Sequence, residues 1–409
     1  MSDVFLEMSG YEFARRVVGP GPKTILQHIN DGRRHDFLTV GKTMVTEPFA
    51  VALTPEAIRS VLQREGDQED GLAKPTDLVC PIDAFRAFDD TSMAGPQVMP
   101  LGEKQRQASI MFRKRFKERE SVAPEVLADL ADEAISTSAR KFGDGNLDLH
   151  AVARGVGVAG VANLLYGEDI TFEEGLRLAY FARYRRQQVF TNSLARSTVA
   201  PKIVGKYHAI KDRRVGVADI VSRLATSSFG RDVVDMFSEG NSGQRSLSPI
   251  TQSISPSSGL STGIFWGMVE RSKGEHDVDD VFVAEVIRHH VASPFSSLRI
   301  GVGGADGERH FVSYATICHD ETLFGDDVHT FNPQRFTDTA VTRRLPTHVF
   351  GLGSHHCPAS SAIPNLVKTA LDVLPDISLP DGDTTSPLLR GVRRGLLMPR
   401  TTPVIVTVR

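Results

Sequence analysis

The residues best suited to chemistry lie in one short segment in the last fifth of the chain. Residues 350–359 read Phe-Gly-Leu-Gly-Ser-His-His-Cys-Pro-Ala, so Gly351 and Gly353 closely precede Cys357. Two such glycines let the backbone turn tightly and point its N–H groups at the cysteine sulfur. Donors of this kind stabilise a thiolate and tune a metal that is bound to it. The segment therefore fits a cysteine that ligates a metal.

Two other interpretations rest on the same residues. One is a buried structural cysteine after a glycine-rich turn, which the composition of the segment alone favours. The other is a zinc site, because His355, His356 and Cys357 are suitable ligands together with Cys318 and His319. Their spacing matches neither the paired-cysteine nor the paired-histidine pattern of common zinc sites. Zinc is therefore the weakest of the three hypotheses.

The segment resembles the heme-binding loop of the cytochrome P450 family, whose pattern is Phe-Gly-x-Gly-x-His/Arg-x-Cys-x-Gly. The matching residues are Phe350, Gly351, Gly353, His355 and Cys357. Only the last position departs, because Ala359 replaces glycine. The resemblance implies that Cys357 is the axial thiolate ligand of the iron of heme b, and that His355 contacts a heme propionate.

Further segments resemble the same family in the same order. Glu285 and Arg288 stand at i and i+3, where a helix lets them pair. Such pairs are common on solvated helices, but this one lies where the family has a Glu-x-x-Arg brace behind the heme. Residues 331–336, Phe-Asn-Pro-Gln-Arg-Phe, resemble the family's Phe-x-Pro-x-Arg-Phe and add Arg335 to the brace. Arg299 lies where the family keeps an arginine for a heme propionate.

The central helix of the family carries an acid and an alcohol that deliver protons during oxygen activation. The best counterpart here is Ser258-Gly259-Leu260-Ser261-Thr262, in which Thr262 supplies the alcohol and Ser261 replaces the acid. A hydroxyl of ordinary pKa does not relay protons as a carboxylate does. Pro256 stands just before this stretch, so we expect the helix to start late or to be kinked.

A second departure concerns the helix in which the family often has His-x-x-x-Arg for the heme propionates. Gln105 and Ser109 stand at those positions, and Arg106 is the candidate to substitute from the neighbouring turn. The basic residues that follow are Arg113, Lys114, Arg115, Lys117 and Arg119. They form either a docking surface for an acidic ferredoxin-type electron donor or an ordinary solvated helix face.

The hydrophobic pattern predicts strands at residues 37–40 and 49–53 and a helix that begins at Thr54-Pro55. Helices are predicted at 124–142, 151–166, 262–271, 278–290 and 359–374, with a closing strand at 403–408. The Ser-, Gly- and Pro-rich residues 237–260 read as a linker or loop. With the resemblance, we predict a mainly α protein with a small β-sheet region and the cytochrome P450 fold. One domain spans residues 1–409, with an N-terminal β-rich part over about 1–65 and a helical heme-binding body over about 66–409.

Composition bounds the partners and the compartment. The 409 residues include 47 Lys+Arg and 50 Asp+Glu, a net charge of −3, which disfavours nucleic acid and anionic membranes as partners. The 40% hydrophobic and 24% charged residues are typical of a globular protein. Three cysteines form no disulfide framework, and neither a signal peptide nor a membrane span is recognisable. We therefore expect a cytoplasmic protein.

The leading functional hypothesis is a monooxygenase or oxidase that uses O₂ and electrons from a redox partner on a small molecule. By resemblance to soluble bacterial family members, we expect a secondary-metabolite substrate. Because Ser261 replaces the acid, the alternative is a heme-thiolate enzyme without conventional O₂ activation, such as a rearrangement, cyclisation, dehydration or peroxygenase catalyst. A third hypothesis is a protein that retains the fold and binds a ligand without catalysis.

Overall fold

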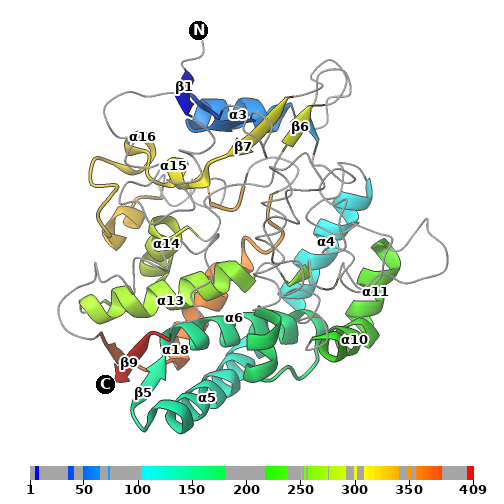
Figure 1. Cartoon of the computed structure of the whole chain (residues 1–409), viewed down its shortest axis with the longest axis vertical. Helices are drawn as coiled ribbons and strands as arrows, with labels where there is room; N and C mark the ends of the chain where they lie inside the picture. Colours follow the sequence, from blue (N-terminus) through cyan, green and yellow to red (C-terminus); the bar gives the residue numbers. More distant parts are fainter. Residues whose placement is uncertain are drawn as a thin grey trace.

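The structure is a computed structural model. It describes residues 5–8, 36–40, 49–64, 72–73, 103–179, 217–237, 250, 253–254, 257–274, 276–291, 299–301, 308–339, 349–351, 356–379 and 403–409. This part of the chain is mainly helical with two small sheets, as the sequence predicts (Figure 1). The helices are α3 (Pro55–Gln63), α4 (Glu103–Glu118), α5 (Ala123–Phe142), α6 (Leu149–Tyr166), α10 (Ala218–Thr226), α11 (Ser228–Phe237), α13 (Ser257–Lys273), α14 (Asp280–His289), α15 (Tyr314–Cys318), α16 (Glu321–Phe324) and α18 (Ala362–Val373), with the short 3-10 helices η2 (Glu120–Val122) and η4 (Pro333–Thr337).

The larger sheet joins the N-terminal strands to strands from the second half of the chain. Its order is β1 (Phe5–Met8), β2 (Phe37–Val40), β3 (Phe49–Ala52), β7 (Arg309–Val312), β6 (Arg299–Gly301) and β4 (Leu72–Ala73). β3 and β7 run parallel, with Ala52 opposite Val312. The predicted strands at 37–40 and 49–53 are thus confirmed, and their sheet is completed by a distant segment.

The smaller sheet ties the C-terminus to the helical body. Its order is β5 (Asn146–Asp148), β9 (Ile405–Val408) and β8 (Ile377–Ser378). The Asp148 carboxylate accepts the N–H groups of His150 and Ala151 at the start of α6, and also that of Val404 at 3.2 Å. One side chain therefore caps a helix and fixes the predicted closing strand.

The predicted helix starts and ends follow the expected local chemistry. Thr54 caps α3 by accepting the N–H of Ala57 at 3.2 Å, and Pro55 occupies the first turn. α5 ends at Gly143, whose φ of 90° lies in the region that glycine tolerates best. α3 begins at Pro55 as predicted, and α5 begins one residue before its predicted start and ends at the predicted residue, since capping signals are local.

The main core lies around α6, which packs against α5 on one side and α13 on another (Figure 1). By length and composition alone, α6 is apolar enough to cross a membrane, but 83% of it is buried within the fold. Because its neighbours cover it on all sides, α6 is hydrophobic around its whole circumference. It is therefore a core helix of this fold.

The prediction of a linker at residues 237–260 is wrong for the part that the structure describes. Ser253, Ile254 and Ser257 are almost fully buried, and the Ser253 hydroxyl donates to Ile250 O at 2.6 Å. Ser253 also hydrogen-bonds to the hydroxyl of Tyr166 at the end of α6. Small polar residues fit in this stretch because the helices pack closely. The buried hydroxyl of Ser253 is satisfied by these hydrogen bonds to neighbouring residues. α13 begins at Ser257, which agrees with the late start expected from Pro256.

Candidate active site

A backbone hydrogen bond joins the two described ends of the cysteine segment. The Cys357 N–H donates to Phe350 O at 2.9 Å, which brings these two ends together. Gly351 has a φ of 88°, a conformation that a residue with a Cβ rarely adopts. Cys357 is half-buried and packs against the main core. The cysteine therefore lies at the edge of the core, with its backbone fixed to Phe350.

Two of the predicted loop residues, Gly353 and His355, lie outside the described residues. Ala359, where the family pattern has glycine, is fully buried and belongs to the main core. Its carbonyl accepts the N–H groups of Ala362 and Ile363, which begin α18. The extra methyl of Ala359 is thus accommodated by core packing.

α18 is held directly against α13. The two backbones approach so closely that a Cβ on Gly263 would overlap the side chain of Val367, and one on Gly267 would overlap Leu371. A Cβ on Gly259 would lie 3.3 Å from Ile363 Cγ2. Because α18 starts directly after the cysteine loop, this contact places Cys357 relative to α13 (Figure 1).

The two residues predicted on the distal helix lie on different sides of α13. The Ser261 hydroxyl sits against the backbone of α6 at Gly157, is buried, and has no hydrogen-bond partner. At 100° per residue, Ser261 is on the side of α13 opposite to the glycines that contact α18. Ser261 therefore takes part in a helix contact, which does not favour its assignment as a catalytic residue.

Thr262 occupies a different stripe of the same helix. It is half-buried and stands one turn before Trp266, a residue that contacts α14 through the ring of His290. Thr262 thus lies on the side of α13 that is turned towards α14, away from α6. Of the predicted distal pair, only Ser261 is shown packed against the backbone of α6.

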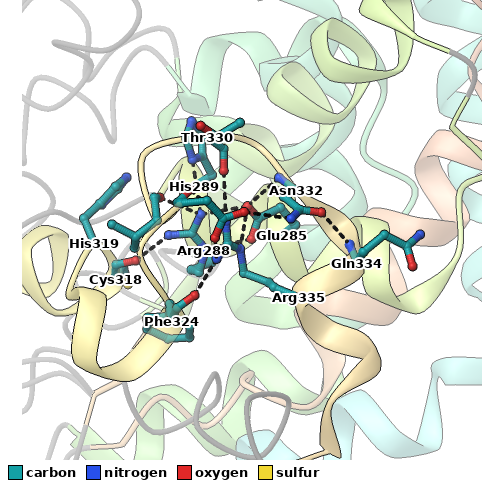
Figure 2. Close-up of polar contacts among 12 residues, drawn as sticks. Glu285, Arg288, His289, Cys318, His319, Phe324, Thr330, Asn332, Gln334 and Arg335 are labelled. Carbon is teal, nitrogen blue, oxygen red and sulfur yellow. Dashed lines mark hydrogen bonds and ion pairs between the residues drawn. The ribbon is translucent and has the colours of Figure 1, made fainter.

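The structure brings the three predicted brace residues together in a fully buried cluster (Figure 2). We call Glu285, Arg288 and Arg335 the brace. Arg288 binds Glu285 in bidentate fashion, with Nε to Oε2 and Nη2 to Oε1 both at 2.7 Å, and both side chains are 0% exposed. Arg335 Nε donates to Glu285 Oε1 at 3.2 Å. A bidentate geometry of this kind is the strong form of the ion pair.

The brace also fixes the chain between α15 and η4. Arg288 donates to the carbonyls of Cys318 at 2.6 Å and Val328 at 3.0 Å. Glu285 Oε1 accepts the N–H of Asn332 at 2.9 Å. Since these three partners are backbone groups, the ion pair also holds the chain between α15 and η4 in place.

Arg335 extends the same network to the surface. Its Nη1 binds Asp327 Oδ1 at 2.8 Å and its Nη2 donates to Thr330 O at 3.1 Å. Hydrogen bonds from Asn332 and Arg335 lower the pKa of the Asp327 carboxyl. The loop around Thr330 is therefore held by hydrogen bonds to a single guanidinium, that of Arg335.

The zinc hypothesis finds no support among the described residues, where no three His, Cys, Asp or Glu side chains are arranged to hold a metal. Cys318 is fully buried, and burial raises the pKa of its thiol to about 12. Burial lowers the pKa of His319 to about 4, and the positive charge of Arg288 acts in the same direction. Neither group is poised as a thiolate or a cation at neutral pH.

On α4, Gln105 and Ser109 stand where the family has His-x-x-x-Arg. These two side chains form a hydrogen bond with each other. Gln105 is buried and its Nε2 donates to Ser109 Oγ at 3.3 Å. Arg106 is exposed on the outer face of the helix, since it is turned 100° from Gln105. This placement does not support the prediction that Arg106 reaches a buried cofactor.

The basic residues of α4 divide into two groups. Arg115 is structural, because its Nε donates to Leu165 O at 2.6 Å and its guanidinium lies 5.6 Å from the ring centroid of Phe229. Arg113, Lys114 and Lys117 are exposed. Arg299, the predicted propionate ligand, lies in β6 opposite His310 of β7. Its backbone therefore belongs to the larger sheet.

Sequence reasoning missed one buried polar cluster. The structure stacks His290 on Trp266 and pairs it with Glu270. The i, i+4 spacing of Trp266 and Glu270 was the available signal, but their partner is 20 residues away from Glu270.

No family model matches the chain, and no curated protein matches its sequence. Solved structures match it in three dimensions. A zebra fish cytochrome P450 solved with abiraterone is 15% identical, covers 94% of this chain and 98% of its own, and gives a TM-score of 0.61. A variant of cytochrome P450 OleT with arachidonic acid is 14% identical, with 94% and 93% covered and a TM-score of 0.62. A variant of cytochrome P450SP alpha is 15% identical, with 85% and 88% covered and a TM-score of 0.58.

Proposed function

We propose that this chain, which has the cytochrome P450 fold, is a heme-thiolate enzyme in which Cys357 ligates the iron of heme b. The observation that carries the proposal is the turn at Cys357, closed by the hydrogen bond to Phe350 O and seated directly before α18. A half-buried thiol whose backbone is held by this hydrogen bond is a fitting donor for the iron. The heme supplies the redox or Lewis-acid chemistry when it is bound.

The surrounding residues take supporting roles in this proposal. Gly351 and Gly353 shape the turn, and His355 and Arg299 hold the heme propionates by charge-assisted hydrogen bonds. The brace keeps the α15–η4 region in place behind the site through Glu285 Oε1 and the Asn332 N–H. These residues act by binding and orienting.

We propose an oxidation of a small molecule as the leading reaction, with Thr262 as the alcohol that holds a proton next to the reacting centre. The placement of Ser261 against Gly157 favours the second candidate, a reaction without conventional O₂ activation. The hydroxyl that replaces the acid then faces α6 at Gly157 and not the side of α13 on which Thr262 lies. Peroxygenation, rearrangement, cyclisation and dehydration all need less proton delivery than reductive O₂ activation.

If electrons are required, we propose that an acidic ferredoxin-type partner docks on α4. The exposed stripe of this helix carries Arg113, Lys114 and Lys117, and Ile110, an exposed apolar side chain, stands one turn before them. Basic residues around one apolar anchor are complementary to an acidic protein surface. A secondary-metabolite substrate and a cytoplasmic location complete the proposal.

The first test is the absorption spectrum of the purified protein when oxidised, reduced, and reduced with carbon monoxide. We expect a red-shifted thiolate-type carbon monoxide band that is lost in Cys357→Ala. Cys318→Ala is the matched control, because Cys318 is the other described thiol and is fully buried. No Soret band after heme addition, or loss of the band in the control alone, would contradict the proposal.

The second test separates the two candidate reactions. Arachidonic acid, ibuprofen and progesterone, each bound by a cytochrome P450 of the same fold, serve as first probes for a ligand-induced spectral shift. Turnover of a responding probe is then measured with a reductant and O₂, with hydrogen peroxide, and without either under anaerobic conditions. Dependence on reductant and O₂ supports the monooxygenase, and turnover without them supports the second candidate.

A further inference from the structure

A buried cluster joins the C-terminal half of α13 to the end of α14. The rings of Trp266 and His290 are parallel, with an angle of 2° and 4.0 Å between their centroids. His290 Nε2 lies 2.8 Å from Glu270 Oε1. The side chains of His290 and Glu270 are 3% and 5% exposed. Aromatic stacking and an ion pair thus both involve the imidazole of His290, which is almost fully buried.

Glu270 is a buried carboxylate with two cationic partners. Lys273 Nζ binds both of its oxygens, at 2.8 and 2.9 Å, from the next turn of α13. Burial alone would raise the pKa of Glu270, but the hydrogen bonds and charges of His290 and Lys273 outweigh burial and lower it. Because a pairwise attraction is reciprocal, the same carboxylate favours the protonated form of His290.

Among the described residues, Arg288 and three further histidines lie near His290. His289 meets it edge-on at 4.8 Å, and Arg288, next on α14, is occupied by Glu285. Beyond His289 lie His319 and then His329, with ring centroids 5.5 and 5.7 Å apart in turn. These groups oppose a proton on His290, whereas Glu270 and the face of Trp266 favour it.

We propose that Trp266, Glu270 and His290 form a protonation-dependent clamp between α13 and α14. With a proton on His290, the imidazolium is held by the Glu270 carboxylate and by the electron-rich face of the indole. Loss of the proton removes the charge attraction and the cation–π contribution together, so that the two helices are held less tightly.

The clamp acts on the part of α13 that carries Thr262. Thr262, Trp266 and Lys273 lie on one stripe of the helix, and Trp266 is one turn from Thr262. α14 carries the brace residues Glu285 and Arg288. The proton on His290 therefore sets how firmly the Thr262 stripe is held against the brace helix, whether or not a heme is bound.

The experiment uses the only tryptophan of the chain as its reporter. We measure Trp266 emission of the purified protein between about pH 5 and pH 8, where histidine titrates. Protonated imidazole quenches a stacked indole more strongly than neutral imidazole, so emission rises in a step with pH. His290→Gln abolishes the step. Glu270→Gln moves its midpoint to lower pH, because the carboxylate no longer favours the proton.

His150→Gln is the matched control, since His150 meets Phe265, the neighbour of Trp266, with centroids 5.5 Å apart and does not contact the clamp. Its emission step is expected at the wild-type midpoint. As a second measurement, the excess stability of wild type over His290→Gln is largest below about pH 6.5 and shrinks as the pH rises through the step. A wild-type emission without a step, or a step that persists in His290→Gln, overturns the proposal. Because emission is read from the protein itself, failure of the heme proposal leaves this test intact.

Discussion

The brace on α14 and the middle of α13 are both buried, but they are built by opposite means. In the brace, Glu285 and Arg288 are fully buried, and their polar atoms meet one another, backbone groups, or the side chains of Arg335 and His289. In the middle of α13, Gly263 and Gly267 let the backbone approach α18, and the buried hydroxyl of Ser261 has no partner. Directional bonds specify the first region, and shape alone specifies the second.

This difference predicts which substitutions the brace and the middle of α13 tolerate. An unpaired buried charge is costly, so the brace tolerates few substitutions at any of its positions. A contact between small residues and apolar side chains restricts size, and within that limit it tolerates many side-chain chemistries. We therefore expect loss of a charge in the brace, and gain of side-chain volume in the middle of α13, to lower the stability of the fold.

The largest effect is expected for Arg288→Ala. It removes the bidentate partner of the buried Glu285 carboxylate and frees two carbonyls, so the free energy of unfolding falls by about 3–5 kcal/mol. The control is Arg223→Ala, which removes an ion pair to Glu174 that is partly exposed and costs about 1 kcal/mol or less. Denaturant unfolding measures both. Equal losses in the two variants would show that burial does not decide the strength of the brace.

The next effect concerns the pH dependence of stability beside the brace. The pKa of His319 is lowered from 6.5 to about 4, so the folded protein binds its proton less readily than the unfolded chain. Stability is therefore complete above about pH 6.5 and is lost as the pH falls to about 4, by roughly 3 kcal/mol at most. His319→Asn keeps a donor for Ala315 O and is expected to flatten this dependence. The same change at the exposed His276 should leave it intact.

Gly263→Ala tests the volume limit on α13. The new methyl would overlap Val367, and overpacking of this kind costs about 1–3 kcal/mol. Gly259→Ala is the control, because its methyl would stand 3.3 Å from Ile363 Cγ2 and the gain in helix propensity, about 1 kcal/mol, offsets the closer contact. Thermal unfolding of the two variants gives the difference. A lower stability for Gly259→Ala than for Gly263→Ala would show that the contact at Gly259 is the tighter of the two.

Ser261→Ala is expected to have the smallest effect. The buried hydroxyl has no partner, so its removal raises stability by less than about 1 kcal/mol. Turnover, measured with a substrate found by the spectral screen, should be unchanged. Ser261→Asp is expected to destabilise the fold, since a carboxylate would stand against the backbone of α6 at Gly157. A gain of reductant-driven turnover in Ser261→Asp would instead make position 261 part of the distal machinery.

Much of the fold follows from local signals in the sequence. Thr54 and Pro55 start α3, Gly143 ends α5, and alternating apolar residues mark β2 and β3. The spacing of Glu285 and Arg288 is equally local, because a helix places residues i and i+3 side by side. The sequence by itself therefore determined these elements, the pairing within α14 and the loop that carries Cys357.

Only the tertiary structure decided what those elements meet. The Ser-rich stretch before α13 reads as a linker because its residues are small and polar, yet Ser253 is buried against Tyr166. Ser261 and Thr262 are neighbours in sequence, but a turn of 100° sends one towards α6 and the other towards α14. His290 finds Glu270 across two helices. Side-chain periodicity shows which residues share a face, whereas the partner of that face depends on contacts between distant segments, which no local pattern contains.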